Sequence, residues 1–357
     1  MMQLFEPVEF LSKMIAVPSV SRQEGAVADL VEQEMNRLGL NCSRYGNNVW
    51  SVLPDYDPSR PTLLLNSHID TVRPAASWTK DPYNPSIVGD RLYGLGSNDA
   101  GASAVCLLGA FTHLYKQKYP INLILALTAE EEVMGEGGIR MFLPLIENEG
   151  YNIDMALVGE PTGMQPAIGE RGLLVLDCVT YGVSGHAARN EGVNALYKAI
   201  SDIEFLRNYR FERESKILGP IKISVTMIEA GTQHNVVPDI CRWVADVRTT
   251  DVFNNEETVQ LLKGVIESEI TPRSTRIWAS VINDTHPLVI AAKEMGGVPY
   301  VSPTTSDMAL MHNIPSLKMG PGQSSRSHTA DEFVLIEEIK GGVSGYIQFL
   351  KNLAKQF

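Results

Sequence analysis

The sequence predicts an α/β fold in which helices cover both faces of a sheet, with a second unit of α+β type inserted into it. The first observation is a set of short apolar runs without alternation, which are typical of strands buried on both faces. These runs are Thr62–Leu65, Ile121–Leu127, Met155–Val158 and Pro315–Met319. The second is the helix-like composition of intervening segments such as residues 100–117, which are rich in Ala, Gly and Leu. The third is that residues 172–280 show a different pattern, with alternating strands and helices in place of uniformly apolar runs.

Two amphipathic helices are expected before the first strand. Residues 5–17 and 24–38 both repeat apolar side chains at helical spacing, so each segment presents one apolar face to a core. The residues concerned are Phe5, Val8, Leu11, Ile15 and Val17 in the first segment, and Val27, Leu30, Val31, Met35 and Leu38 in the second.

The inserted unit is expected to be ferredoxin-like. Its predicted elements are a strand over Leu173–Tyr181, a helix over 192–207, alternating strands over 221–229 and 240–250, a helix over 256–269 and a strand over 275–282. The order β-α-β-β-α-β is that of a ferredoxin-like unit. A length of 357 residues also favours two domains. We therefore predict a larger domain of residues 1–171 and 282–357, and an inserted domain of residues 172–281.

Composition narrows the class of partner. The formal net charge of −12 and the isoelectric point near 5.1 argue against nucleic acid and anionic membranes, which need a basic face. The four cysteines form no Cys-x-x-Cys pair, and this spacing favours reduced thiols in a cytoplasm. Acids near the N-terminus do not fit a signal peptide, and no apolar run is long enough to span a bilayer. A cytoplasmic protein that acts on a small molecule is expected.

Groups that can bind metal follow each apolar run. They are His68 and Asp70, then Glu130, Glu131 and Glu132, then Glu160, then His328, while Asp99 lies in a glycine-rich turn. Ligands in α/β sheets sit beyond the carboxyl ends of the strands, so these side chains are expected to meet. Taken singly, each has another interpretation: a sheet-edge histidine, a helix-capping aspartate or a solvated acidic loop. The glycine spacing fits neither a dinucleotide-binding turn nor a P-loop.

Together the residues favour a dinuclear catalytic metal site. Histidine and carboxylate ligands suit zinc, and the thiolates of a structural zinc site are missing from the set. Asp70 stands two residues after His68 on a strand, on the same side, where it can orient the imidazole.

These motifs resemble those of the acetylornithine deacetylase and succinyl-diaminopimelate desuccinylase family, relatives of aminoacylase and carboxypeptidase G. The resemblance runs in order from residues 15–21 to residues 327–332. It implies a zinc-peptidase-like mixed sheet with an inserted lid or dimerisation domain. It also implies two Zn²⁺ per subunit, with Co²⁺ as a possible substitute. One zinc is implied for His68 and Glu160, the other for Glu132 and His328, with Asp99 bridging both.

Further roles follow from the same resemblance. Glu131 is implied as the general base and Asp70 as the carboxylate behind His68. In the inserted domain, His186 matches a histidine that polarises the scissile carbonyl, in related enzymes often from the partner subunit of a homodimer. Asn235 and Arg248 match substrate-holding positions, and a guanidinium suits a substrate carboxylate. Thr305 falls in a segment that resembles a substrate pocket.

The implied reaction is metal-dependent hydrolysis of the amide bond of an N-acyl amino acid. The residues in these motifs are most similar to those of acetylornithine deacetylases. The resemblance therefore favours N-acetylornithine, or an N-acetylcitrulline or N-succinylornithine type of substrate, in arginine biosynthesis. One departure is that Ala100, Gly101 and Ala102 follow Asp99 where many relatives have Met-Lys-Gly. The alternative enzyme is a dinuclear zinc dipeptidase or carboxypeptidase. A non-catalytic metal-binding or nucleotide-binding protein is disfavoured, because Glu131 would be superfluous there.

Overall fold

The computed structural model describes residues 5–357, which separate into two compact units. The larger unit runs to Ile168 and includes Ile282–Val301 and Ser306–Phe357. The smaller unit consists of Gly169–Val281 and Ser302–Thr305. The prediction about a signal sequence falls partly on residues 1–4, which lie outside the described residues. Among residues 5–357, no helix is long and apolar enough to cross a membrane.

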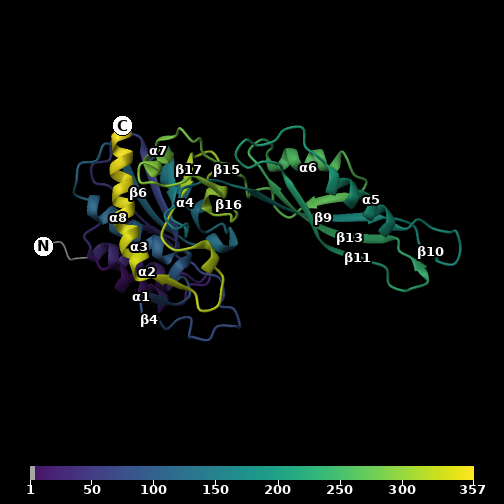
Figure 1. Cartoon of the computed structure of the whole chain (residues 1–357), viewed down its shortest axis with the longest axis horizontal. Helices are drawn as coiled ribbons and strands as arrows, with labels where there is room; N and C mark the ends of the chain where they lie inside the picture. The colour runs from purple at the N-terminus through teal and green to yellow at the C-terminus, as the bar shows by residue number, and fades with distance from the viewer. Residues whose placement is uncertain (1–4) are drawn as a thin grey trace. The chain divides into compact units, whose positions relative to one another are not determined.

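A mixed sheet forms the centre of the larger unit (Figure 1). Its strand order is β1-β2-β6-β3-β7-β17-β8-β15, with β16 pairing with β8, and the central strands β6, β3, β7 and β17 are parallel. The strands are β1 Cys42–Tyr45, β2 Asn48–Val52, β3 Thr62–His68, β6 Asn122–Thr128, β7 Met155–Val158, β8 Ala167–Glu170, β15 Ser280–Val281, β16 Tyr300–Ser302 and β17 Ser316–Lys318. A small separate sheet has the order β18-β5-β4, from Phe333–Leu335, Arg91–Tyr93 and Ser86–Val88.

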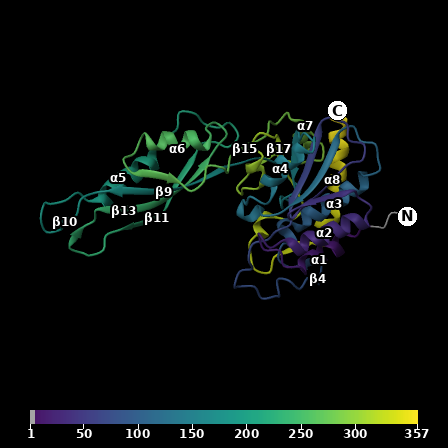
Figure 2. The ribbon, with the colours of Figure 1, turned by 180° about the vertical axis from the view of Figure 1, so that it is seen from behind.

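Helices cover both faces of this sheet, as the sequence predicts (Figures 1 and 2). Leu63 and Leu65 of β3 belong to one hydrophobic cluster, whereas Leu64 between them belongs to another on the opposite face. The first cluster includes side chains of α1 Pro7–Ile15, α2 Gly25–Arg37, α3 Ala102–Leu114, α7 Pro287–Lys293 and α8 Ile336–Leu353. The second includes those of α4 Ile139–Asn148. Each fully buried leucine contributes about 1.5–3 kcal/mol, so both faces stabilise the strands that end at the candidate site.

The smaller unit has the predicted β-α-β-β-α-β order. Its sheet is antiparallel with the order β11-β13-β9-β14, and alternate residues of β9 such as Leu174 and Leu176 pack against α5 and α6. The elements are β9 Gly172–Tyr181, α5 Ala195–Asn208, β11 Lys222–Ala230, β13 Ile240–Thr249, α6 Asn255–Lys263 and β14 Glu269–Pro272. β10 Gly185–His186 and β12 Val236–Val237 form a separate two-stranded antiparallel sheet.

The predicted end of the inserted unit is wrong in two elements. The second helix stops at Lys263 and not at 269, because Gly264 caps it and the chain then turns into β14, which pairs with β9. The predicted strand over 275–282 is reduced to Ser280–Val281, which pairs with β8. Asn255 donates its side-chain amide to the carbonyls of Thr275 and Ile277. These carbonyls are therefore bonded to a side chain, which the apolar pattern of the segment does not reveal.

Candidate metal centre

The site lies at the carboxyl edge of the parallel strands. His68 is the last residue of β3 and pairs in register with Thr128 at the end of β6, while Val158 at the end of β7 pairs with Asn66. The chain therefore delivers His68, the residues after Thr128 and Glu160 to the same edge of the sheet. Asp99 comes from the turn Ser97–Gly101, and His328 from the loop before β18.

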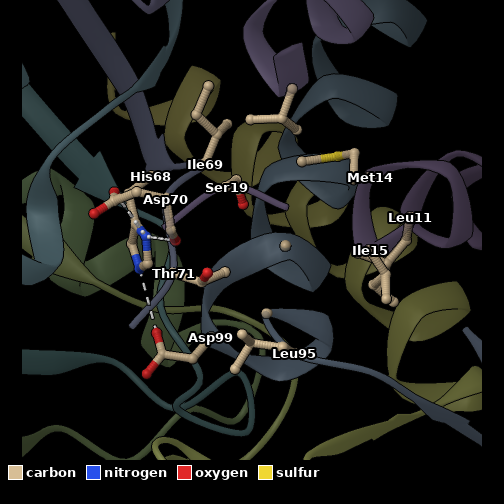
Figure 3. A pocket seen from close by; sticks show the side chains of 13 residues that line it. Leu11, Met14, Ile15, Ser19, His68, Ile69, Asp70, Thr71, Leu95 and Asp99 are labelled. Carbon is tan, nitrogen blue, oxygen red and sulfur yellow. Dashed lines mark hydrogen bonds and ion pairs between the residues drawn. The ribbon is translucent and has the colours of Figure 1, made fainter. Parts of the chain in front are cut away.

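Five predicted ligands converge in two overlapping groups, His68 with Asp99 and Glu160, and Asp99 with Glu132 and His328. His68 Nε2 lies 3.3 Å from Asp99 Oδ1 and 3.6 Å from Glu160 Oε1. His328 Nε2 lies 2.8 Å from Glu132 Oε2 and 3.7 Å from Asp99 Oδ2. Figure 3 shows the imidazole of His68 directed at Asp99. Each oxygen of Asp99 thus faces one histidine, which is the arrangement a bridging carboxylate needs.

The three consecutive glutamates face different surroundings. Glu131 is buried, with Oε2 3.9 Å from His68 Nε2, and Glu132 faces His328. Glu130 adopts a left-handed backbone conformation with φ of 57° and turns its side chain away. Its carboxylate accepts a hydrogen bond from the backbone N–H of Gly137 at 3.2 Å. Two of the three carboxylates therefore enter the site, and Glu130 does not.

Asp70 lies beside His68, where its role as the carboxylate that orients the imidazole stays a prediction, and it makes further contacts. His68 Nδ1 bonds to the backbone oxygen of Asp70 at 2.9 Å, whereas the Asp70 carboxylate is 3.4 Å from Nδ1 (Figure 3). A proton on Nδ1 leaves Nε2 with its lone pair toward the site. The Asp70 carboxylate accepts the backbone N–H groups of Glu131 and Glu132, at 3.1 and 3.2 Å. It therefore orders the turn that carries these two glutamates.

Electrostatics in the cluster favour a bound cation. Burial, with the nearby charge of Asp99, raises the pKa of Glu160 to about 8, and burial raises the pKa of Glu131 well above its ordinary value. The hydrogen bond to Glu132 raises the pKa of His328 to about 9. Divalent cations would reverse these shifts by stabilising the carboxylates and neutral imidazoles. Glu160 Oε1 is also buried without a hydrogen-bond partner among the described residues, as expected of a metal ligand. The residues present therefore fit a dinuclear centre.

The predicted substrate residues belong to the smaller unit. His186 and Asn235 lie next to each other, because His186 pairs with Val236 and the N–H of Ala187 donates to the Asn235 carbonyl at 3.0 Å. Arg248 forms a bidentate ion pair with Asp246, at 2.7 and 3.0 Å. Thr305 ends the segment Ser302–Thr305. The contribution of these residues to the metal centre stays a prediction.

Sequence reasoning missed four buried charged residues around the cluster, namely Glu24, Asp307, Lys318 and Glu332. Asp307 raises the pKa of Glu131, and Lys318 lowers that of Glu160, each after the larger effect of burial. Lys318 carried a signal in the sequence, since a lysine within an apolar strand is rarely buried without a specific reason. The other three stand in polar segments, where nothing in the sequence marks a carboxylate as buried.

Comparison with known proteins decides the family. The family model "Peptidase family M20/M25/M40" matches residues 64–352 of the chain. The chain belongs to this M20 family. The family resemblance predicted from the motifs is therefore confirmed.

Relatives of this M20 protein extend over nearly its whole length. A succinyl-diaminopimelate desuccinylase of Wolbachia pipientis wMel is 24% identical over 97% of the chain and 93% of its own length. One from Dinoroseobacter shibae is 27% identical, with 97% and 99% covered. An M20 family metallo-carboxypeptidase from Sulfolobus solfataricus has a TM-score of 0.74 at 20% identity, with 99% and 100% covered. The M20 protein is a metal-dependent hydrolase of amide or peptide bonds, and its fold is confirmed.

Proposed function

We infer that this M20 protein hydrolyses the amide bond of an N-acyl amino acid at a centre of two Zn²⁺ ions, for which Co²⁺ can substitute. The observation that carries the proposal is the convergence of His68, Asp99, Glu132, Glu160 and His328 in two overlapping groups that share Asp99. A buried carboxylate, Glu131, stands beside them and forms a third group with His68 and Glu132, but the two groups that share Asp99 are complete without it. A site for binding alone has no use for this additional acid.

Each side chain has a chemical task in this proposal. When bound by these residues, the two ions would supply Lewis-acid polarisation and would lower the pKa of the attacking water toward about 7. Glu131 takes the proton of the attacking water and returns it to the nitrogen of the leaving amine. Asp70 holds the backbone of Glu131 in place through the 3.1 Å hydrogen bond from its N–H. Asp70 also bonds His68 through its carbonyl, so one residue orients both a ligand and the base.

His186 is proposed to stabilise the oxyanion of the tetrahedral intermediate, either in its own subunit or across a homodimer. Its Nδ1 accepts a hydrogen bond from the backbone N–H of Ala188 at 3.1 Å. The neutral ring therefore carries its proton on Nε2, and the side chain is exposed. An exposed N–H donor is the group that an oxyanion requires.

Arg248 is proposed to bind the substrate carboxylate, with Asn235 and Thr305 as further contacts. Asp246 occupies the edge of the guanidinium formed by Nε and Nη2. Arginine has five N–H donors, so the edge that includes Nη1 can still bind a second carboxylate. Asp246 also restricts the arginine to one orientation, which favours a bidentate contact with the substrate.

The proposed substrate is N-acetylornithine, or an N-acetylcitrulline or N-succinylornithine type of molecule, which places the reaction in arginine biosynthesis. The sequence of the motifs supports an ornithine-like amino acid. The name of the desuccinylase relatives supports removal of an acyl group from a diamino acid. The four cysteines are free thiols, which supports a cytoplasmic location. The alternative is a dipeptidase or carboxypeptidase with the same centre.

A turnover panel on zinc-loaded protein tests the proposal. It compares N-acetylornithine, N-acetylcitrulline, their N-succinyl counterparts, N-succinyl-diaminopimelate and several dipeptides by kcat/KM. We expect an acylated ornithine or citrulline to give the highest value. A dipeptide that exceeds every acyl amino acid would establish the peptidase alternative, and a preference for N-succinyl-diaminopimelate would reassign the amino acid.

A further inference from the structure

Glu332 is a buried carboxylate that binds the turn of Asp99. Its side chain is 2% exposed and accepts three backbone N–H groups. Oε1 accepts from Asn98 at 2.8 Å and from Asp99 at 2.9 Å, and Oε2 accepts from Gly96 at 3.1 Å. Three backbone hydrogen bonds from one turn to a single side chain exceed what a helix cap usually supplies.

The turn needs this support because its backbone is irregular. Gly96 has a φ of 76°, and Asp99 has φ and ψ of −116° and 102°, outside the helical region, just before α3 begins at Ala102. N–H groups before a helix have no partners within the helix. Glu332 accepts these groups on one side of the turn. On the other side, the Asn98 side chain bonds to the N–H and the carbonyl of Gln323, at 2.9 and 3.1 Å.

The orientation of Asp99 therefore depends on Glu332. With the N–H of Asp99 fixed, its two oxygens point to His68 and to His328, at 3.3 and 3.7 Å. His328 itself lies four residues before Glu332 in the same loop. One short loop thus carries a predicted ligand and also holds the turn of the predicted bridging ligand.

We propose that Glu332 is a positioning residue that fixes the Asp99 turn, and thereby the bridge between the two metal positions, through its three backbone hydrogen bonds. Glu332 acts only through Asp99 and touches neither the substrate nor the reacting atoms. The proposal rests on the two-metal function inferred above. It predicts that the turn is ordered by Glu332 before any ion binds.

The test is the substitution Glu332→Gln in the full-length protein. All three partners of the carboxylate are N–H donors, so the new amide nitrogen must face at least one of them whichever way it is turned. We expect the peptide that covers residues 94–101 to exchange its amide hydrogens faster in chelator-treated protein. We also expect one of the two Zn²⁺ ions to bind on the order of 10- to 100-fold more weakly, and the visible spectrum of the Co²⁺-loaded protein to change.

Glu338→Gln is the matched control. Glu338 also accepts a backbone N–H, that of Leu335 at 2.9 Å, and it pairs with Arg326 at 2.6 Å, so these bonds hold the start of α8 and not residues 96–99. We expect this variant to retain the wild-type Zn²⁺ affinity and Co²⁺ spectrum. If Glu332→Gln fails to fold, Glu332→Asp keeps the carboxyl group, and its shorter side chain cannot reach all three N–H groups. That variant is expected to show the same losses.

The proposal is overturned if a Glu332 variant binds both Zn²⁺ ions with wild-type affinity and an unchanged Co²⁺ spectrum. It is also overturned if Glu338→Gln loses as much Zn²⁺ affinity, since the effect would then be general. Failure of the wild-type protein to bind a second ion would instead contradict the proposed function. In that case, hydrogen exchange still tests the positioning role. If amides 94–101 of Glu332→Gln exchange at the wild-type rate, the role is rejected, and faster exchange supports it.

Discussion

Neighbouring carboxylates acquire different chemistry from the direction of their side chains. Glu130 bonds to the N–H of Gly137, Glu131 is buried beside His68, and Glu132 pairs with His328. Two backbone N–H groups of this run are held by Asp70, and that of Glu130 is accepted by Glu24 at 3.2 Å. The turn is therefore ordered by acids that lie far away in the sequence.

Glu131→Gln is expected to retain both metal ions and to lose on the order of 10²-fold or more in kcat, the usual scale for a general base. The reason is that glutamine keeps the shape of the side chain but cannot accept the proton. Steady-state kinetics with metal analysis of the same sample checks this. Glu130→Gln is the control, since its oxygen can still accept the N–H of Gly137. Near-normal turnover in Glu131→Gln would assign the base elsewhere.

The sequence predicts which residues meet in the site better than it predicts what holds them. His68, Glu132 and Glu160 could be found because each follows an apolar run of strand length, and parallel strands end at one edge. Glu332 could be seen in its motif, but its burial depends on contact with Gly96, more than two hundred positions earlier in the chain. Such contacts leave no periodic trace in the sequence.

At the level of elements, buried strands and amphipathic helices follow the sequence closely. Met155–Val158 is a strand over the predicted range, and α1 and α2 lie within the predicted segments. Over 275–282, Ile277 forms only an isolated bridge with Leu173, and the Asn255 side chain also binds the carbonyls of Thr275 and Ile277. Pairing of the short β14 with β9 depends on partners that apolar alternation does not identify.

The N-terminus of α7 is expected to make stability depend on pH. His286 caps this helix, with Nδ1 accepting the N–H of Leu288 at 3.2 Å, and burial lowers its pKa below the ordinary 6.5. The unfolded chain therefore binds a proton at higher pH than the folded chain does. The contribution of His286 to stability is complete above about pH 6.5 and is lost as the pH falls below that value.

His286→Asn tests this linkage, because asparagine caps helices without titrating. Urea unfolding at a series of pH values from about 7 downward measures the dependence. The wild-type protein should lose more stability toward acid than the variant does. Equal pH slopes for the two proteins would exclude His286 as the source.

A buried hydroxyl chain stabilises the core of the smaller unit. Thr180 Oγ1 accepts from Trp243 Nε1 at 3.1 Å and bonds to Ser268 Oγ at 2.6 Å. Thr180→Val leaves both groups without this partner and should cost about 1–3 kcal/mol of unfolding free energy. Thr271→Val, at an exposed position of β14 in the same sheet, should stay within about 0.5 kcal/mol. Denaturant unfolding measures the loss of stability in both variants. An equal loss in the two would show that the hydroxyl chain does not stabilise this core.

The whole molecule consists of two units with separate hydrophobic clusters. All five predicted ligands belong to the larger unit, so Zn²⁺ should stabilise that unit and leave the other unchanged. An ion present at 100 times its Kd adds about 2.7 kcal/mol to the free energy of unfolding of the unit that binds it. Buried cysteines report on each unit separately, with Cys106 in the larger and Cys178 and Cys241 in the smaller.

Thiol labelling during heating, read by mass spectrometry, measures this difference. Chelation should lower the temperature at which Cys106 becomes reactive and leave that of Cys178 and Cys241 in place. An equal shift at all three cysteines would show that the units unfold as one, and no shift at Cys106 would show that the ions do not stabilise the larger unit.

The most direct test of the metal centre is anomalous X-ray diffraction at the zinc absorption edge from crystals of the zinc-loaded protein. We expect two peaks per chain. One should be bound by His68, Asp99 and Glu160, and the other by Asp99, Glu132 and His328. Peaks that lie away from these five side chains, or a single peak that leaves one group empty at saturating zinc, would contradict it.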